Sequence, residues 1–303
     1  MNKTTLRYTA ISALLCMGLL INGCQEVGPY VNLHNNVASA TYIETPAQQP
    51  EAKNVLIDLF TGVSCSNCPP SHDILNNMIQ ANGHIIGIEY HPGGSYWGLD
   101  HLPPGTKQNM TWSGAPTLFA NGALTDPATG PVGAVDRIVQ PMSQAIGGPS
   151  IWDLSSTWAG YAASELSMAP PVNINLVSAY NAGMKQFNIS VVLHYNIMAH
   201  ADTNRLSIYL TEDSIVTSQL LPNQSIDTNY IHMHVMRAAV TNILGDNITA
   251  AIVPGLVDSV GYTYTLSPSD SLWKPAHMNV VALVHKYQNG TYNILQAKLI
   301  KAK

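Results

Sequence analysis

Residues 61–69 read TGVSCSNCP and place two cysteines, Cys65 and Cys68, three positions apart. The stretch directly before them, residues 55–60 (VLIDLF), is a nearly continuous apolar run, which is typical of a strand that is buried on both faces. Residues 71–80 carry apolar side chains at helical spacing. The sequence therefore predicts a cysteine pair at the N-terminus of a helix that follows a buried strand.

A second apolar run, residues 84–90 (HIIGIEY), follows the predicted helix. Strand, helix and strand in this order predict a βαβ unit with a parallel strand pair. A third short strand is expected at residues 117–120, and a further helix at residues 135–146. We therefore assign residues 53–147 to an α/β domain.

The next segment, residues 148–171, is predicted to contain a connecting helix, at residues 152–168, and a linker that ends in two prolines. Over residues 172–303, short runs alternate apolar and polar residues and are separated by turn signals. This period of two predicts an all-β antiparallel sandwich domain. Two of its histidines, His232 and His234, are expected to share one strand face, opposite Ile231, Met233 and Val235, and to face either solvent or the other domain rather than to bind a metal.

Residues 1–23 have the pattern of a secretory signal peptide, because two basic residues precede an apolar run that is shorter than the about 20 residues a membrane span needs. The run ends in LINGC at residues 20–24, which resembles the lipobox of bacterial lipoproteins. The resemblance implies acylation of Cys24 and an outer-membrane lipoprotein of the cell envelope. An ordinary signal peptide with a chance cysteine is the alternative. Residues 24–52 contain several Asn, Gln and Pro residues, so we expect a flexible tether there.

Charged residues make up only 10% of the chain, against about 25% in a typical soluble protein, and the formal net charge is -5. This composition lacks the basic excess that nucleic-acid binding requires. The four cysteines are too few for a disulfide-dense scaffold. Since Cys16 leaves with the signal peptide and Cys24 carries lipid, only Cys65 and Cys68 remain as thiols, too few for an all-cysteine zinc site. We therefore predict no metal site and no cofactor.

The position of the two remaining thiols indicates redox chemistry. A cysteine at a helix N-terminus meets unpaired N–H groups and the positive end of the helix dipole, which stabilise its thiolate. A second sulfur one turn later lies within disulfide reach, so that attack and resolution can occur in one site. We predict disulfide exchange with envelope proteins, with Cys65 as the nucleophile and Cys68 as the resolving thiol. The open alternative is a permanent Cys65–Cys68 disulfide in a non-enzymatic surface binding protein.

The cysteine motif in this context resembles the thioredoxin superfamily. Residues 114–122 (GAPTLFANG) are similar to the segment in which thioredoxins carry a cis-proline just before a strand. The resemblance implies that Pro116 is cis and packs beside the cysteines, and that Ala115 offers its backbone to an extended substrate. It also implies a buried acid on the preceding strand as a proton acceptor, for which Asp58 is the candidate, one residue further upstream than usual.

The segment after the second predicted strand, residues 91–106, is rich in Pro and Gly and contains Tyr96 and Trp97. In parallel α/β sheets, the loops at the carboxyl ends of the strands form the binding site. We therefore expect these two aromatic residues, together with Ala115 and Thr117, to form the wall of a substrate groove. The alternative is a packed surface loop.

Most of the chain is also similar to a narrower family, the outer-membrane-protein-28-like lipoproteins of Bacteroidota. The residues that carry this resemblance are FTG at 60–62, CSNCP at 65–69, NYIHMHVMR at 229–237 and YNILQA at 292–297. The resemblance implies an α/β thioredoxin-like domain followed by a β-rich C-terminal domain. It also implies a location in the cell envelope.

Overall fold

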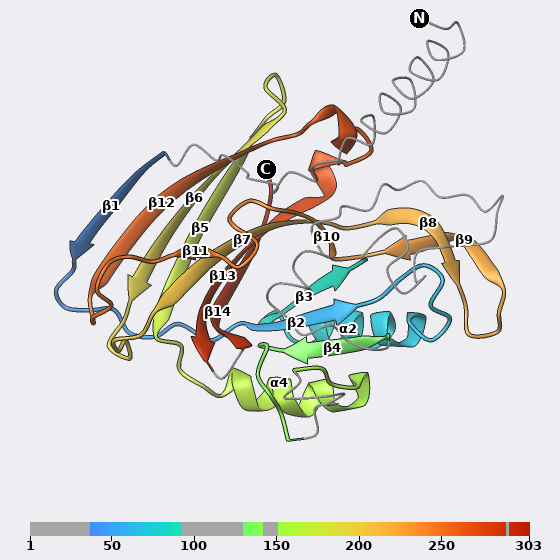
Figure 1. The fold of residues 1–303 in the computed structure, drawn as a ribbon, viewed down its shortest axis with the longest axis horizontal. Helices are drawn as coiled ribbons and strands as arrows, with labels where there is room; N and C mark the ends of the chain where they lie inside the picture. Colours follow the sequence, from blue (N-terminus) through green and yellow to red (C-terminus); the bar gives the residue numbers. More distant parts are fainter. Residues whose placement is uncertain (1–36, 92–129, 142–150, 289–290) are drawn as a thin grey trace, which may run out of the picture. The chain divides into compact units, whose positions relative to one another are not determined.

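The strand that precedes the cysteines is β2 (Val55–Phe60), and all of its residues are buried. It pairs in parallel with β3 (Ile85–Tyr90), and the helix α2 (Pro69–Ala81) connects the two strands. The βαβ unit predicted from the apolar runs is therefore confirmed (Figure 1). The computed structural model describes residues 37–91, 130–141, 151–288 and 291–303.

The βαβ unit belongs to an eight-stranded mixed sheet with the order β14-β13-β7-β10-β3-β2-β4, in which β11 also pairs with β7. The added strands are β4 (Val132–Val135), β7 (Asn204–Glu212), β10 (Val235–Ala239), β11 (Asp246–Asn247), β13 (Met278–Gln288) and β14 (Thr291–Lys301). β4 pairs antiparallel with β2, whereas β10 pairs in parallel with β3 and antiparallel with β7. One sheet therefore continues across the boundary that we predicted at residue 172.

A second, four-stranded sheet is antiparallel throughout and has the order β1-β12-β6-β5. Its strands are β1 (Val37–Ile43), β5 (Val172–Asn181), β6 (Gln186–Tyr195) and β12 (Leu256–Thr265). Apolar side chains of β5 and β6, such as Ile174 and Leu193, share one buried cluster with Ile208 of β7 and Val280 of β13. The two sheets therefore pack on each other, and the β-rich antiparallel structure predicted after residue 172 is confirmed at this level.

The helices α2 and α4 (Trp158–Leu166) form a second core with one face of β2, where Ile57 and Leu59 contact the cluster of Leu75 and Trp158. Trp158 is fully buried against Gly133 of β4. A Cβ atom at residue 133 would collide with the indole ring, so this position requires glycine.

The flexible tether predicted at residues 24–52 is wrong from Val37 onward, because β1 pairs with β12 along Val37–Ile43. An edge strand is held by main-chain hydrogen bonds, so it needs few large apolar residues, and the side chain of Ile43 is in fact exposed. Beyond β1, the amide of Gln48 bonds to the ring of His194 at 2.7 Å. The segment is therefore part of the folded unit.

The predicted helices after β4 also need correction. Val135 ends β4, and the next two residues, Asp136 and Arg137, form a turn with positive φ angles of 49° and 55°. The carboxylate of Asp136 fixes this turn, since it accepts the main-chain N–H of Leu56 at 2.8 Å and pairs with Lys53 at 2.7 Å. The helix predicted at residues 135–146 therefore does not begin where the apolar spacing suggested.

The connecting helix is shorter than the predicted span of residues 152–168, because α4 begins only at Trp158, after the 3-10 turn η1 (Ser155–Thr157).

A separate antiparallel hairpin consists of β8 (Ile215–Leu220) and β9 (Ile226–His232). In Figure 1 this hairpin lies by the carboxyl ends of β2 and β3, near the start of α2. Further 3-10 turns in the described part of the chain are η2 (Pro268–Asp270) and η3 (Pro275–His277).

Candidate functional site

The two cysteines form a disulfide, with 5.4 Å between their Cα atoms. Cys68 caps α2, and its carbonyl oxygen accepts the main-chain N–H groups of Ser71 at 2.9 Å and His72 at 3.1 Å. The cysteine pair thus lies where the sequence predicts it, between a buried strand and the first turn of a helix. Pro69 begins the helix, where its missing N–H group leaves no hydrogen bond unmade.

The disulfide is shielded from solvent. Cys68 is 0% exposed and Cys65 is 6% exposed. Cys65 is thus the less buried of the two cysteines, and its role as the nucleophile stays a prediction. The small exposed fractions also mean that the disulfide is more enclosed than a cysteine pair at a helix N-terminus leads one to expect from sequence.

Part of this enclosure comes from the β8–β9 hairpin, which bonds to the loop of residues 61–68, called here the disulfide loop. The side-chain amide of Gln219 donates to the carbonyl oxygens of Cys65 at 3.1 Å and Gly62 at 3.3 Å. The main-chain N–H of Leu220 donates to the carbonyl oxygen of Val63 at 2.7 Å. Sequence reasoning missed these contacts because the partners are more than 150 positions apart.

Behind the disulfide loop lies a buried histidine–glutamate cluster, formed by His72, Glu89, His91 and His232. The carboxylate of Glu89 lies 3.9 Å from the Nε2 atoms of both His72 and His91. The rings of His91 and His232 lie edge to face, with their centroids 5.3 Å apart. One signal for this cluster was present in the sequence, since Glu89 interrupts an apolar strand, and a buried carboxylate needs polar partners.

His72 connects this cluster to both the disulfide loop and the hairpin. Its Nε2 atom bonds to the hydroxyl of Thr61 at 2.6 Å, and its Nδ1 atom bonds to the hydroxyl of Tyr230 at 2.9 Å. Burial lowers the pKa of His72 and, more strongly, that of His232. Burial alone would raise the pKa of the Glu89 carboxyl, but its interactions with the histidines outweigh this and lower it.

The same cluster excludes the solvent-facing alternative for His232 and leaves the interdomain one. His232 points inward and is buried, whereas its neighbour Ile231 is exposed. His234 adopts a positive φ of 56° between β9 and β10, which breaks the regular alternation on which the prediction relied. Within the described residues, no group of three or more His, Cys, Asp or Glu side chains is arranged to hold a metal ion.

Asp58 is buried, but the structure gives it partners of its own. Its carboxylate accepts hydrogen bonds from Nε of Arg137 at 2.8 Å and from the hydroxyl of Tyr90 at 2.6 Å. By strand alternation, it shares the face of β2 with Leu56 and Phe60, whereas the other face packs under α2. The proton-acceptor role implied by resemblance stays a prediction, and the observed geometry is that of a buried ion pair.

The remaining predicted site residues, Cys24, Tyr96, Trp97, Ala115, Pro116 and Thr117, lie outside the described residues. Within the described part, the bond between Gly130 and Pro131 is cis and directly precedes β4. The register of β4, with Val132 opposite Phe60, places this proline beside the start of the disulfide loop. Sequence reasoning did not single out Pro131.

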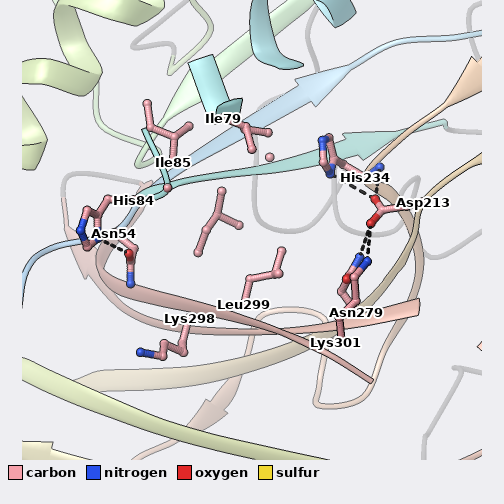
Figure 2. Close-up of a pocket in the computed structure, with 13 residues that line it drawn as sticks. Asn54, Ile79, His84, Ile85, Asp213, His234, Asn279, Lys298, Leu299 and Lys301 are labelled. Carbon is pink, nitrogen blue, oxygen red and sulfur yellow. Dashed lines mark hydrogen bonds and ion pairs between the residues drawn. The ribbon is translucent and has the colours of Figure 1, made fainter. Parts of the chain in front are cut away.

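A separate cavity of about 400 Å³ lies between the end of α2, the start of β3 and the β13–β14 pair (Figure 2). At one end, Asp213 accepts hydrogen bonds from His234, Asn279 and Lys301. Burial alone would raise the pKa of the Asp213 carboxyl, but the hydrogen bonds from His234 and Asn279 and the charge interaction with the His234 ring outweigh it and lower this pKa far below its ordinary value. Apolar side chains such as Leu299 form part of the cavity wall, and no cysteine lines the cavity.

No curated protein matches the chain. Among solved structures, HBP35 of Porphyromonas gingivalis is similar, with a TM-score of 0.59 and 14% identity over 84% of this chain and 76% of that chain. A domain of the outer membrane lipoprotein Omp28 from the same organism matches with a TM-score of 0.30 and 18% identity, over 44% of this chain and 88% of that chain.

The described residues contain no helix that is long and apolar enough to cross a membrane. The family described as outer membrane protein Omp28 matches residues 123–303, which is more than half of the chain. The chain therefore belongs to the Omp28 family of outer membrane proteins, which places it in the cell envelope.

Proposed function

We propose that this protein is a thiol–disulfide exchange protein with a thioredoxin-like N-terminal domain, in which Cys65 is the nucleophile and Cys68 the resolving thiol. The observation that carries the proposal is the Cys65–Cys68 disulfide at the N-terminus of α2. The parallel pair β2 and β3, joined by α2 and extended by the antiparallel β4, supports the thioredoxin-like assignment.

The exchange is a reversible transfer of one disulfide bond. A substrate thiolate attacks the sulfur of Cys65, the Cys65–Cys68 bond breaks, and Cys68 leaves as a thiolate at the positive end of the α2 dipole. A second substrate thiolate then attacks the substrate sulfur of the mixed disulfide. The substrate becomes oxidised, and the protein is left with two reduced cysteines. In the reverse direction, the Cys65 thiolate attacks a substrate disulfide, and Cys68 resolves the intermediate.

The test uses the mature chain with Cys24→Ser, so that no lipid is attached. After reduction, a Cys68→Ser variant should accumulate mixed disulfides with envelope proteins through Cys65, because no resolving thiol remains. The matched control is Cys65→Ser, which keeps one thiol but places it at the fully buried position. If Cys68→Ser traps no more protein than this control, and wild type does not reduce insulin, the exchange function is refuted.

The second candidate is a surface binding protein in which the disulfide is structural. The burial of Cys68 and the near-burial of Cys65 favour it, and the cavity of Figure 2 offers a binding site. This candidate predicts that a double Cys65→Ser, Cys68→Ser variant loses stability but keeps every binding activity of the wild type. It fails if mixed disulfides form on Cys65.

Lipid attachment at Cys24 is part of the same proposal, because it would hold the protein at the outer membrane. A full-length Cys24→Ser variant should leave the membrane fraction and appear in the soluble periplasmic or secreted fraction. Cys16→Ser, which alters a cysteine inside the signal peptide, is the matched control and should fractionate as wild type does. Continued membrane association of Cys24→Ser would exclude acylation as the anchor.

A further inference from the structure

The β8–β9 hairpin has two unlike faces. Val216 and Ile231 are cross-strand partners and are 42% and 57% exposed, so they form the outer face. The neighbouring pair, Thr217 and Tyr230, lies on the opposite face, where Thr217 is buried. The buried face of the hairpin is therefore mainly polar, whereas the exposed pair of Val216 and Ile231 is apolar, which reverses the usual arrangement at this position of a surface strand pair.

The polar inner face attaches to the disulfide loop through hydrogen bonds. Gln219 bonds to the carbonyl oxygens of Gly62 and Cys65, and the main-chain N–H of Leu220 bonds to Val63. On β9, the hydroxyl of Tyr230 bonds to the ring of His72, at the first turn of α2. The hairpin thus binds carbonyl oxygens of the segment that leads to Cys65 and of Cys65 itself.

Apolar contacts contribute little to this attachment. Among the buried apolar clusters of the described residues, the hairpin supplies a single member, Ile215, which contacts Val235 of β10. Hydrogen bonds that break at a surface are largely replaced by bonds to water, whereas buried apolar area is not compensated in this way. A segment held mainly by polar contacts can therefore detach without unfolding the core.

We propose that the β8–β9 hairpin is a displaceable cover over the Cys65–Cys68 disulfide, and that an extended polypeptide segment of the partner takes its place during exchange. The groups released by opening are three main-chain carbonyl oxygens of the disulfide loop, those of Gly62, Val63 and Cys65. Main-chain N–H groups of an extended segment satisfy such acceptors. The identity of the partner rests on the proposed exchange function, but the cover itself does not.

The cover is tested by the rate at which a small phosphine, TCEP, reduces the disulfide in the folded chain. Gln219→Ala removes the side-chain donor and should raise this rate by about tenfold, which corresponds to about 1.4 kcal/mol. Gln224→Ala is the matched control, because this glutamine lies in the turn of the same hairpin and its amide reaches only Pro222. Equal rates for wild type and both variants would overturn the proposal.

Hydrogen exchange tests the cover in wild type, without any substitution. The Leu220 N–H, which bonds to Val63, should exchange through local opening and therefore faster than the N–H of Val281 in β13, which is paired on both sides by β14 and β7. If both amides exchange only through global unfolding, the hairpin is not displaceable and the proposal fails. Because this measurement uses wild type, it decides the proposal even if Gln219→Ala does not fold.

The partner class is tested with an unstructured peptide that contains one cysteine, compared with glutathione at equal thiolate concentration. The peptide should react faster with the oxidised protein, and Gln219→Ala should widen the difference. Equal rates for both reductants would remove the extended segment from the proposal. If TCEP reduces Gln219→Ala faster and the Leu220 N–H exchanges fast, but Cys68→Ser traps no protein, the displaceable cover stands and the exchange function is refuted.

Discussion

The buried pair of Asp58 and Arg137 separates a structural role for Asp58 from a role in proton transfer. Asp58 is 0% exposed, and its carboxylate accepts hydrogen bonds from two nitrogens of Arg137, at 2.8 and 3.2 Å, and from Tyr90. Asp58→Asn removes the negative charge but keeps the size of the side chain. The guanidinium of Arg137 would then stay buried without its neutralising carboxylate, which costs about 3–5 kcal/mol.

The assay is equilibrium unfolding of the oxidised chain in urea, and Asp58→Asn should lower the free energy of unfolding by this amount. Asp202→Asn is the matched control. Asp202 pairs with Lys286 at 3.3 Å, but both side chains are partly exposed, so its loss should cost at most about 1 kcal/mol. A double variant, Asp58→Leu with Arg137→Met, should recover most of the loss, since apolar residues of similar volume replace a buried pair at little cost.

The reasoning is refuted if Asp58→Asn lowers stability by less than 1 kcal/mol, or if the double variant is less stable than the single one. A structural role also requires that Asp58→Asn leave the pH profile of disulfide exchange unchanged, when it is measured where the variant is still folded. A shifted profile would instead restore the proton-acceptor role that the thioredoxin resemblance implies for Asp58.

Three further predictions concern packing and pH. Gly133→Ala should lower the free energy of unfolding in urea by about 1–3 kcal/mol, because a Cβ atom there collides with the ring of Trp158. The control is Gly160→Ala in α4, where a Cβ atom meets no neighbouring atom, so that this variant should be neutral or stabilising. The pKa of Asp213 is lower in the folded chain than its unfolded pKa of about 3.9, so its ionised carboxylate stabilises the fold at any pH above about 3.9. This stabilisation is lost as the pH falls through the folded pKa. In urea unfolding at a series of pH values, Asp213→Asn should therefore show a smaller loss of stability on acidification than wild type. Burial lowers the pKa of His232 in the folded chain, so as the pH drops below about 6.5 the unfolded chain takes up a proton at this residue before the folded chain does, and the free energy of unfolding should fall. His232→Gln should reduce the slope of the free energy of unfolding against pH between about pH 5 and 7. An unchanged slope would contradict the buried, neutral state of His232.

The parts of the fold that could be predicted are those with a short-range signal. The apolar run of residues 55–60, the helical spacing after Cys68 and the run ending at Tyr90 gave a βαβ unit that the structure confirms. The helix expected at residues 135–146 shows the limit of such signals. Apolar spacing alone cannot reveal that Asp136 binds Lys53 and Leu56, contacts that hold the chain in a turn at that point.

The division into domains illustrates the same limit at a larger scale. The change of pattern near residue 172 is real, because strands with period two dominate after it. Sheet pairing, however, depends on which strand edges meet in space, and β10 carries the sheet from β7 to β3. In the same way, β1 joins the second sheet through main-chain hydrogen bonds to β12, which the Asn, Gln and Pro content of residues 24–52 did not indicate.

The sequence by itself determined the cysteine pair, its place between a strand and a helix, and the residues that mark the Omp28 family, because these features depend on neighbouring positions. Only the tertiary structure decided what surrounds the disulfide. It brings Gln219 to Gly62 across 157 positions, and Tyr230 to His72 across 158. Burial by such distant partners limits the access of a thiolate to Cys65, so the accessibility of the site is a property of the fold.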